Sequence, residues 1–121
     1  MKLQPQITAL VAAPGQTKLR PAVVLRALRF GEEGWVVWSS TTEVWPQATL
    51  IAEVESTSRD GINMQLPPGA SHFYLPIAHM RTIFVPNGTI TPLGRCRTAL
   101  MERLMPAFES FLADNPEYRL R

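Results

Sequence analysis

The sequence predicts an α+β fold, mainly β, in which a small barrel or curled sheet of short strands is followed by one C-terminal helix. Short apolar and β-branched segments recur between Pro- and Gly-containing turns from residue 6 to residue 85. After Gly94 the apolar residues change to helical spacing. The length of 121 residues fits one hydrophobic core. We therefore expect a single domain over residues 1–121, with a barrel at about 5–92, a helix at about 97–113 and a polar tail at 114–121.

Three strands are predicted in the first third of the chain, at residues 6–13, 22–28 and 35–38. The second strand begins with an unbroken apolar run, which indicates burial on both faces or a central position in a curled sheet. The third strand contains Trp35 and Trp38, which are three positions apart and therefore face opposite sides of the sheet. At least one of them should lie in the core, and a tryptophan that does not is a candidate for stacking on nucleic-acid bases.

The middle of the chain predicts shorter and weaker elements. We expect a hydroxyl cluster at 39–42 where the third strand ends, then a loop, and an exposed turn at 55–61. Further strands are expected at 50–54, 63–66, 73–77 and 80–85.

The C-terminal helix is predicted from an apolar stripe along one face. Pro106 falls inside this stripe and should kink the helix or split it in two, because proline removes a hydrogen bond and crowds the preceding turn. The stripe consists of Leu100, Leu104, Phe108, Phe111 and Leu112.

Composition narrows the classes of function. The net charge is only +2, yet ten of the twelve basic residues are arginine, whose planar guanidinium suits phosphate contacts. No basic segment followed by an apolar one opens the chain, and no apolar run approaches a membrane span, so we expect a cytoplasmic protein without a membrane partner. The two histidines and one cysteine have no metal-ligand spacing, so neither a metal nor another cofactor is expected.

Cys96 is the single cysteine and cannot form an internal disulfide. Its neighbours Arg95 and Arg97 would lower the pKa of an exposed thiol and favour a nucleophile. The alternative, which we favour, is a small buried apolar residue at the start of the helix.

The segment from Lys18 to Leu25 joins a cationic pair to a buried strand through Pro21. Proline pushes the residue before it into an extended conformation, which presents the Arg20 guanidinium at the rim of the strand. Arg20 is either a phosphate ligand or a solvated charge at the start of a strand.

Three passages in this order resemble the MazF/PemK (Kid) toxin family of bacterial toxin–antitoxin systems. They are residues 18–25 around Arg20-Pro21, the hydroxyl cluster at 39–42, and Met80-Arg81-Thr82-Ile83 with Leu93-Gly94-Arg95 following. The resemblance implies an SH3-like small barrel of the MazF/PemK/CcdB plasmid-maintenance toxin type. It also implies a homodimer and growth inhibitor that cleaves single-stranded RNA without a metal and is held inactive by a cognate antitoxin protein.

The resemblance further implies roles for individual residues. Arg20 would stabilise the transition state, and Thr41 would bind the same phosphate or assist proton transfer. Attack by a ribose 2′-hydroxyl builds negative charge on the phosphate oxygens, which a fixed guanidinium and a hydroxyl donor stabilise. The RNA-binding candidates are Lys18, Ser40, Thr42, Trp45 and Arg81.

The chain departs from the family pattern in two places. Where members often carry an acidic residue and a glutamine before the Arg-Thr-Ile pattern, this chain has Ala78-His79, so His79 is either the proton-transfer group or a half-buried strand residue. The loop before Arg20, at 14–17, is short for the family.

These departures keep two other functions open. A catalytically inactive toxin-like module that binds RNA or protein fits the missing acid. A CcdB-like toxin that acts on a protein target is disfavoured, because that activity has no need of a phosphate-binding arginine.

Overall fold

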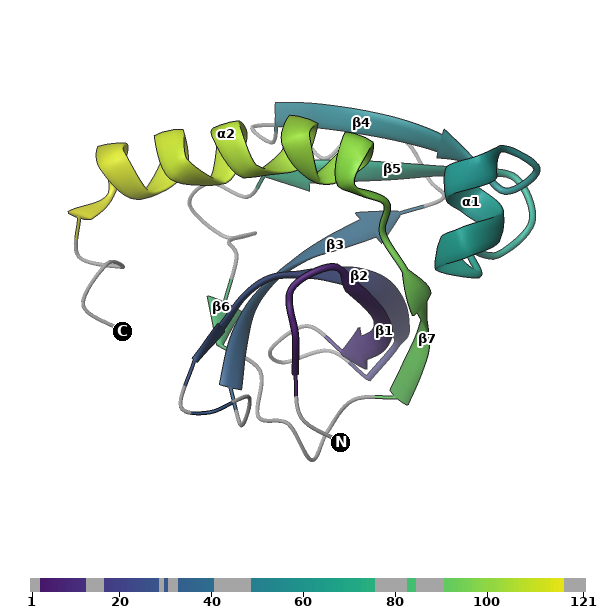
Figure 1. Ribbon diagram of the computed structural model, residues 1–121, viewed down its shortest axis with the longest axis horizontal. Helices are drawn as coiled ribbons and strands as arrows, with labels where there is room; N and C mark the ends of the chain where they lie inside the picture. Colours follow the sequence, from purple (N-terminus) through teal and green to yellow (C-terminus); the bar gives the residue numbers. More distant parts are fainter. Residues whose placement is uncertain are drawn as a thin grey trace.

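Seven antiparallel strands and two helices form the described part of the computed structural model, residues 3–12, 17–28, 30, 33–40, 49–75, 83–84 and 91–116 (Figure 1). The strands are β1 Ile7–Ala12, β2 Leu19–Leu28, β3 Glu33–Ser40, β4 Thr49–Glu55, β5 Ala70–Leu75, β6 Ile83–Phe84 and β7 Thr91–Arg95. The helices are α1 Arg59–Met64 and α2 Thr98–Asp114. This arrangement confirms a mainly antiparallel β fold with a C-terminal helix.

The strands pair in the order β4-β5-β3-β2-β1-β7, with β6 on β3. Strands β1, β2 and β3 form a curled meander, and β7 adds to the free edge of β1 (Figure 1). The end of β3 leaves β2 and pairs with β5 through Ser39 and Ser40. Strand β3 therefore joins the curled meander to the β4-β5 hairpin.

Two apolar clusters lie on the two faces of β2 and β3, because successive side chains of a strand point in opposite directions. Val23, Leu25 and Trp35 pack toward α2. Val24 and Trp38 pack with β1 on the opposite face. The expected burial of β2 on both faces is confirmed. Both tryptophans are buried, with 2% and 6% of their surfaces exposed, so neither can stack on a base.

Helix α2 covers one face of the sheet with the predicted apolar stripe, all five members of which are buried. The expected split at Pro106 is wrong, because α2 runs through it as one helix. Pro106 is on the exposed side, while Leu104 and Phe108 on either side of it are buried in the core. Packing of these neighbours offsets the hydrogen bond that proline removes.

The predicted strand at 63–66 is wrong, because residues 59–64 form α1. The Ser58 hydroxyl caps this helix by accepting a hydrogen bond from the amide of Gly61 at 3.1 Å. The side chain of Met64 is fully buried, and Gln65 ends the helix in the left-handed conformation. The cap at Ser58 and the burial of Met64 therefore outweigh the weak preference of residues 63–66 for a strand. The expected turn at 55–61 extends only to Ser58, because the helix begins at Arg59.

Strand β7 was not anticipated from the sequence, since Pro92 and Gly94 are weak strand formers. It pairs with β1 alone, so Pro92 lies on an edge strand, where proline is tolerated. Strand β6 falls within the predicted strand at 80–85, and β5 overlaps the one predicted at 73–77; the rest of both lies outside the described residues, as does the predicted tail beyond residue 116. Neither described helix has the length and apolar character needed to cross a lipid bilayer.

Candidate functional site

Arg20 is the second residue of β2 and pairs with Val11 of β1. It is half-buried, whereas the four residues from Ala22 to Leu25 are fully buried. Pro21, which joins these two environments, is also half-buried. The guanidinium therefore belongs to the rim of the curled sheet, as the Arg-Pro sequence predicts.

A cavity of about 400 Å³ lies beside this rim. Lys18 and Arg20 contribute two cations to its wall. Leu10 of β1, Leu19 of β2 and Leu93 of β7 contribute apolar surface. A wall that combines cations with apolar side chains is suited to a ligand with both a phosphate and a flat apolar group. Two of the predicted residues, Lys18 and Arg20, are thus brought together.

Ser39 closes the same cavity from β3. Its hydroxyl donates a hydrogen bond to the carbonyl of Pro21 at 3.0 Å, and the residue is 2% exposed. This first member of the hydroxyl cluster therefore holds two strands together. Ser40 ends β3, while the predicted site residues Thr41, Thr42, Trp45, His79 and Arg81 lie outside the described residues.

His72 of β5 and Glu53 of β4 are neighbouring polar residues on the face of the sheet opposite α2. Ser40 of β3 pairs with His72 of β5, and His72 pairs with Glu53 of β4. Residues directly opposite each other in a sheet point to the same face. Phe73 and Val54, which neighbour His72 and Glu53 in sequence, pack toward α2, so the side chains of His72 and Glu53 point away from α2.

Arg20 lies apart from these two residues, at the start of β2. The last register pair between β2 and β3 is Ala22 with Trp38, and the end of β3 then pairs with β5. The hydrogen bond between Ser39 and Pro21 keeps the two strands together at this point. Arg20 therefore lies on the part of β2 that pairs with β1, whereas His72 and Glu53 lie on the β4-β5 hairpin.

His72 was not singled out from the sequence, which drew attention to His79 instead. Its Nε2 atom lies 3.7 Å from Oε1 of Glu53, and its ring stacks on Tyr74 with the centroids 6.4 Å apart. The side chain is 15% exposed. Ser71 and Phe73 are buried on either side of His72, and this alternation was the signal in the sequence that His72 faces away from the core. The strands that lie beside His72 follow only from the fold.

Cys96 is fully buried at the start of α2. Burial raises the pKa of its thiol to about 12, and the negative charge of Asp60 adds to the effect. Burial therefore disfavours a thiolate nucleophile, and the expected buried position at the start of the helix is confirmed. Among the described residues, no group of three or more His, Cys, Asp or Glu side chains converges to hold a metal ion.

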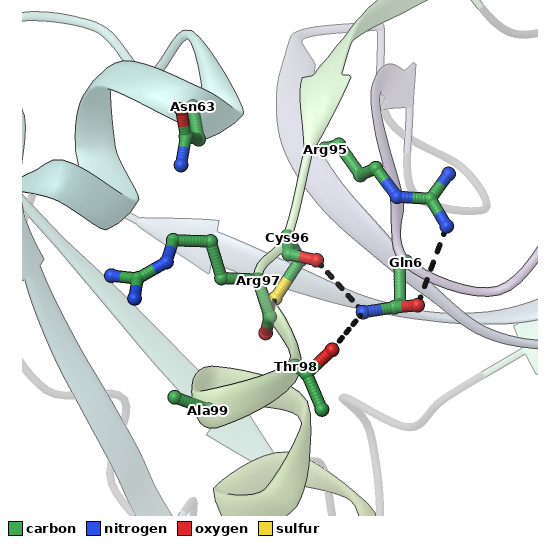
Figure 2. A pocket seen from close by; sticks show the side chains of 7 residues that line it. All are labelled: Gln6, Asn63, Arg95, Cys96, Arg97, Thr98 and Ala99. Atoms are coloured by element: carbon green, nitrogen blue, oxygen red, sulfur yellow. Dashed lines mark hydrogen bonds between the residues drawn. The ribbon is translucent and has the colours of Figure 1, made fainter.

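A second cavity of about 620 Å³ lies where β7 meets α2 (Figure 2). Gln6, in the left-handed conformation with φ of 78°, bridges it: Nε2 donates to the Cys96 carbonyl at 3.1 Å, and Oε1 accepts from Arg95 at 3.4 Å. Arg97 points the other way, toward α1, where its Nη1 atom lies 3.6 Å from Oδ1 of Asp60 (Figure 2). Both guanidinium groups here have acceptors within the protein, so this cavity is the weaker candidate for an anion.

Comparison of the chain with models of protein families, with curated proteins and with solved structures finds no match.

Proposed function

We propose that this protein is a metal-independent endoribonuclease of the MazF/PemK toxin type, built on an SH3-like barrel, that cleaves single-stranded RNA at Arg20. The observation that carries the proposal is the position of Arg20 at the rim of the sheet, where it lines the wall of a cavity together with Lys18. A phosphate at the guanidinium would have the Lys18 ammonium on the same cavity wall.

The chemistry requires charge stabilisation at one phosphate. Attack by the 2′-hydroxyl on the adjacent phosphorus displaces the 5′-oxygen and leaves a 2′,3′-cyclic phosphate. Arg20 donates hydrogen bonds to the equatorial oxygens as their charge grows, and the Thr41 hydroxyl, next in sequence to Ser40, supplies a further donor. Substrate selection follows from the nucleophile, since DNA has no 2′-hydroxyl.

The cavity supplies binding around that phosphate. Lys18 pairs with a neighbouring phosphate, and Leu10, Leu19 and Leu93 form an apolar surface for a base. Ser40, Thr42, Trp45 and Arg81 are the other proposed RNA contacts. The protein acts in the cytoplasm as a homodimer, and its antitoxin inhibits it by occupying the surface beside Arg20.

A second candidate is a toxin-like module that binds RNA or protein without cleaving it. Ala78 favours it, because it stands where related toxins often carry an acidic residue. This candidate uses the same cavity and the same arginine, and it differs from the first only in the absence of cleavage.

The test is incubation of the purified protein with a long, weakly structured RNA in excess chelator, with sequencing of the cut ends. We expect cyclic phosphate ends, no cleavage of the matching DNA, and loss of cleavage in Arg20→Ala and Thr41→Ala. Arg103→Ala is the matched control, because Arg103 is an exposed arginine on α2. Intact RNA that is nevertheless bound through Arg20 would support the binding module instead.

A further inference from the structure

We propose that Gln65 binds the edge of an adenine base beside the phosphate at Arg20 and so sets a sequence preference; this inference rests on the proposed binding of RNA in this cavity. Gln65, Lys18 and Arg20 line the same cavity of about 400 Å³. Its volume falls in the range of sites that enclose a small ligand, such as one nucleotide of an RNA strand.

The Gln65 side chain differs chemically from the other described side chains that line the cavity. Lys18 and Arg20 can only donate hydrogen bonds. Ser39 is 2% exposed, and its hydroxyl already donates to the carbonyl of Pro21. The remaining side chains are apolar, namely Leu10, Leu19, Pro21, Pro67 and Leu93. The Gln65 amide both donates and accepts, so it is the lining group that can distinguish one base from another.

The backbone holds Gln65 firmly at this wall. Gln65 ends α1 in the left-handed conformation, with φ of 56°, and its backbone amide donates to the carbonyls of Gly61 and Ile62. Met64 before it and Leu66 after it are both buried. The exposed Gln65 side chain therefore extends from a backbone that is anchored on both sides.

Strand β7 places an apolar surface beside this side chain. A Cβ atom on Gly94 would lie 2.9 Å from the carbonyl carbon of Met64, so the backbones of β7 and α1 are in direct contact. Leu93 precedes Gly94, Gln65 follows Met64, and both line the cavity. A base that packs on Leu93 can therefore present its edge to the Gln65 amide.

Backbone preference does not explain a glutamine at position 65. A helix that ends in the left-handed conformation favours glycine or asparagine there, and other residues adopt that conformation at a cost. Residues held in such unfavourable conformations cluster at binding and catalytic sites. The side chain of Gln65 therefore points to a role in binding.

The chemistry of the amide favours adenine. A glutamine amide can form two hydrogen bonds with adenine, accepting one from the N6 amino group and donating one to N7. Single-stranded RNA leaves these edges open to a protein. A purine also covers more of the apolar wall than a pyrimidine does. A glutamate in the same place could only accept, which suits the N4 amino group of cytosine instead.

The experiment is fluorescence anisotropy with 2′-O-methyl oligonucleotides of adenine, cytosine or uracil, in excess chelator. The 2′-O-methyl group blocks attack on the phosphate, so binding is measured whether or not the protein cleaves RNA. The wild type should bind the adenine oligomer about 5 to 50 times more tightly than the cytosine oligomer. Gln65→Gly, which suits the left-handed backbone, should bring this ratio close to one, and Gln65→Glu should favour cytosine.

Three controls separate recognition of the base from binding of the phosphate. An oligomer of 7-deazaadenine lacks N7, so the wild type should bind it more weakly than adenine, while Gln65→Gly should bind the two equally. Arg20→Ala should weaken binding of all the oligomers by a similar factor, because it removes a phosphate contact. Gln4→Ala should change nothing, because Gln4 is an exposed glutamine that does not line the cavity.

Each outcome bears on the inference. Equal wild-type affinity for the three bases, a preference for cytosine or uracil, or an adenine preference that persists in Gln65→Gly overturns the role of Gln65. Cleavage of long RNA in any of these cases leaves the ribonuclease function standing. An adenine preference that Gln65→Gly abolishes, in a protein that leaves RNA intact, supports the role of Gln65 and overturns the ribonuclease. Absence of binding to every oligomer overturns the role of Gln65, and the ribonuclease falls with it only if long RNA also stays intact.

Discussion

Ser39 of β3 donates a hydrogen bond from its hydroxyl to the carbonyl of Pro21 on β2, with the two oxygens 3.0 Å apart. The bond lies where β3 stops pairing with β2 and begins to pair with β5. Pro21 follows Arg20 directly, so this one hydroxyl fixes the strand that carries the proposed phosphate ligand. Ser39, a residue of the predicted hydroxyl cluster, therefore supports the proposed site indirectly, by holding the backbone next to Arg20 in place.

Replacing Ser39 with alanine should lower the free energy of unfolding by about 1 kcal/mol, the usual net contribution of one hydrogen bond. Cleavage should also fall, because the start of β2, which carries Arg20, is held less firmly. Urea unfolding and the RNA assay measure the two effects. Ser110→Ala, at an exposed position of α2, is the matched control. Equal stability of the two variants would mean that the Ser39 bond contributes nothing.

The strands of the meander were predictable because they carry their own signals. β2 has an unbroken apolar run, and β3 places two tryptophans on opposite faces. β7 was missed because its sequence, Thr-Pro-Leu-Gly-Arg, has no local strand signal. Its position depends on contacts with β1 and α1, which lie far from it in sequence.

Gly94 shows how close that contact is. A Cβ atom at this position would lie 2.9 Å from the carbonyl carbon of Met64 and closer still to the carbonyl oxygen of Asn63. Both are backbone atoms of α1 and cannot rotate away.

Gly94→Ala should therefore separate β7 from α1 and lower the free energy of unfolding by about 3 kcal/mol or more. Gly69→Ala is the comparison, because a Cβ there meets no atom within 4 Å and only its φ of 100° is unfavourable. We expect about 1 to 2 kcal/mol for that variant. Denaturant unfolding measures both, and a smaller loss for Gly94→Ala than for Gly69→Ala would contradict the close packing.

The candidate site was less predictable than the fold. Arg20 was identifiable because Pro21 constrains it locally, and Lys18 lies close to it in sequence. His72 was not, because its neighbours Glu53 and Ser40 belong to other strands. Local sequence can indicate which residues are extended, but the pairing of His72 with Glu53 and Ser40 depends on the order of β4, β5 and β3.

Pro106 should be replaceable with a gain in stability. It lies in the interior of the 17-residue helix α2, with its ring on the exposed side. Alanine restores the amide that can bond to the carbonyl of Glu102 and is the stronger helix former. We expect Pro106→Ala to raise the free energy of unfolding by about 1 to 2 kcal/mol. This is a net value, because alanine also gives the unfolded chain more conformational freedom than proline does, which favours unfolding. A decrease, or a gain no larger than that of Ser110→Ala, would show that proline fits this helix without cost.

Cys96 should make stability fall at alkaline pH. Burial holds the pKa of its thiol near 12 in the folded protein, against an ordinary value of 9.0. Below pH 9 the thiol is protonated in both states and has no effect on the pH dependence. Between pH 9 and 12 only the unfolded chain loses the proton, so deprotonation favours unfolding.

Urea unfolding of the wild type and Cys96→Ala at pH 8.0 and 10.5 isolates this contribution, because the other titrating groups are common to both proteins. The wild type should lose more stability than the variant over this interval. The native thiol should also react with an alkylating reagent at pH 8 far more slowly than the unfolded one, since it is both buried and protonated. Parallel loss of stability in the two proteins, with rapid native labelling, would show that the thiol ionises in the folded state.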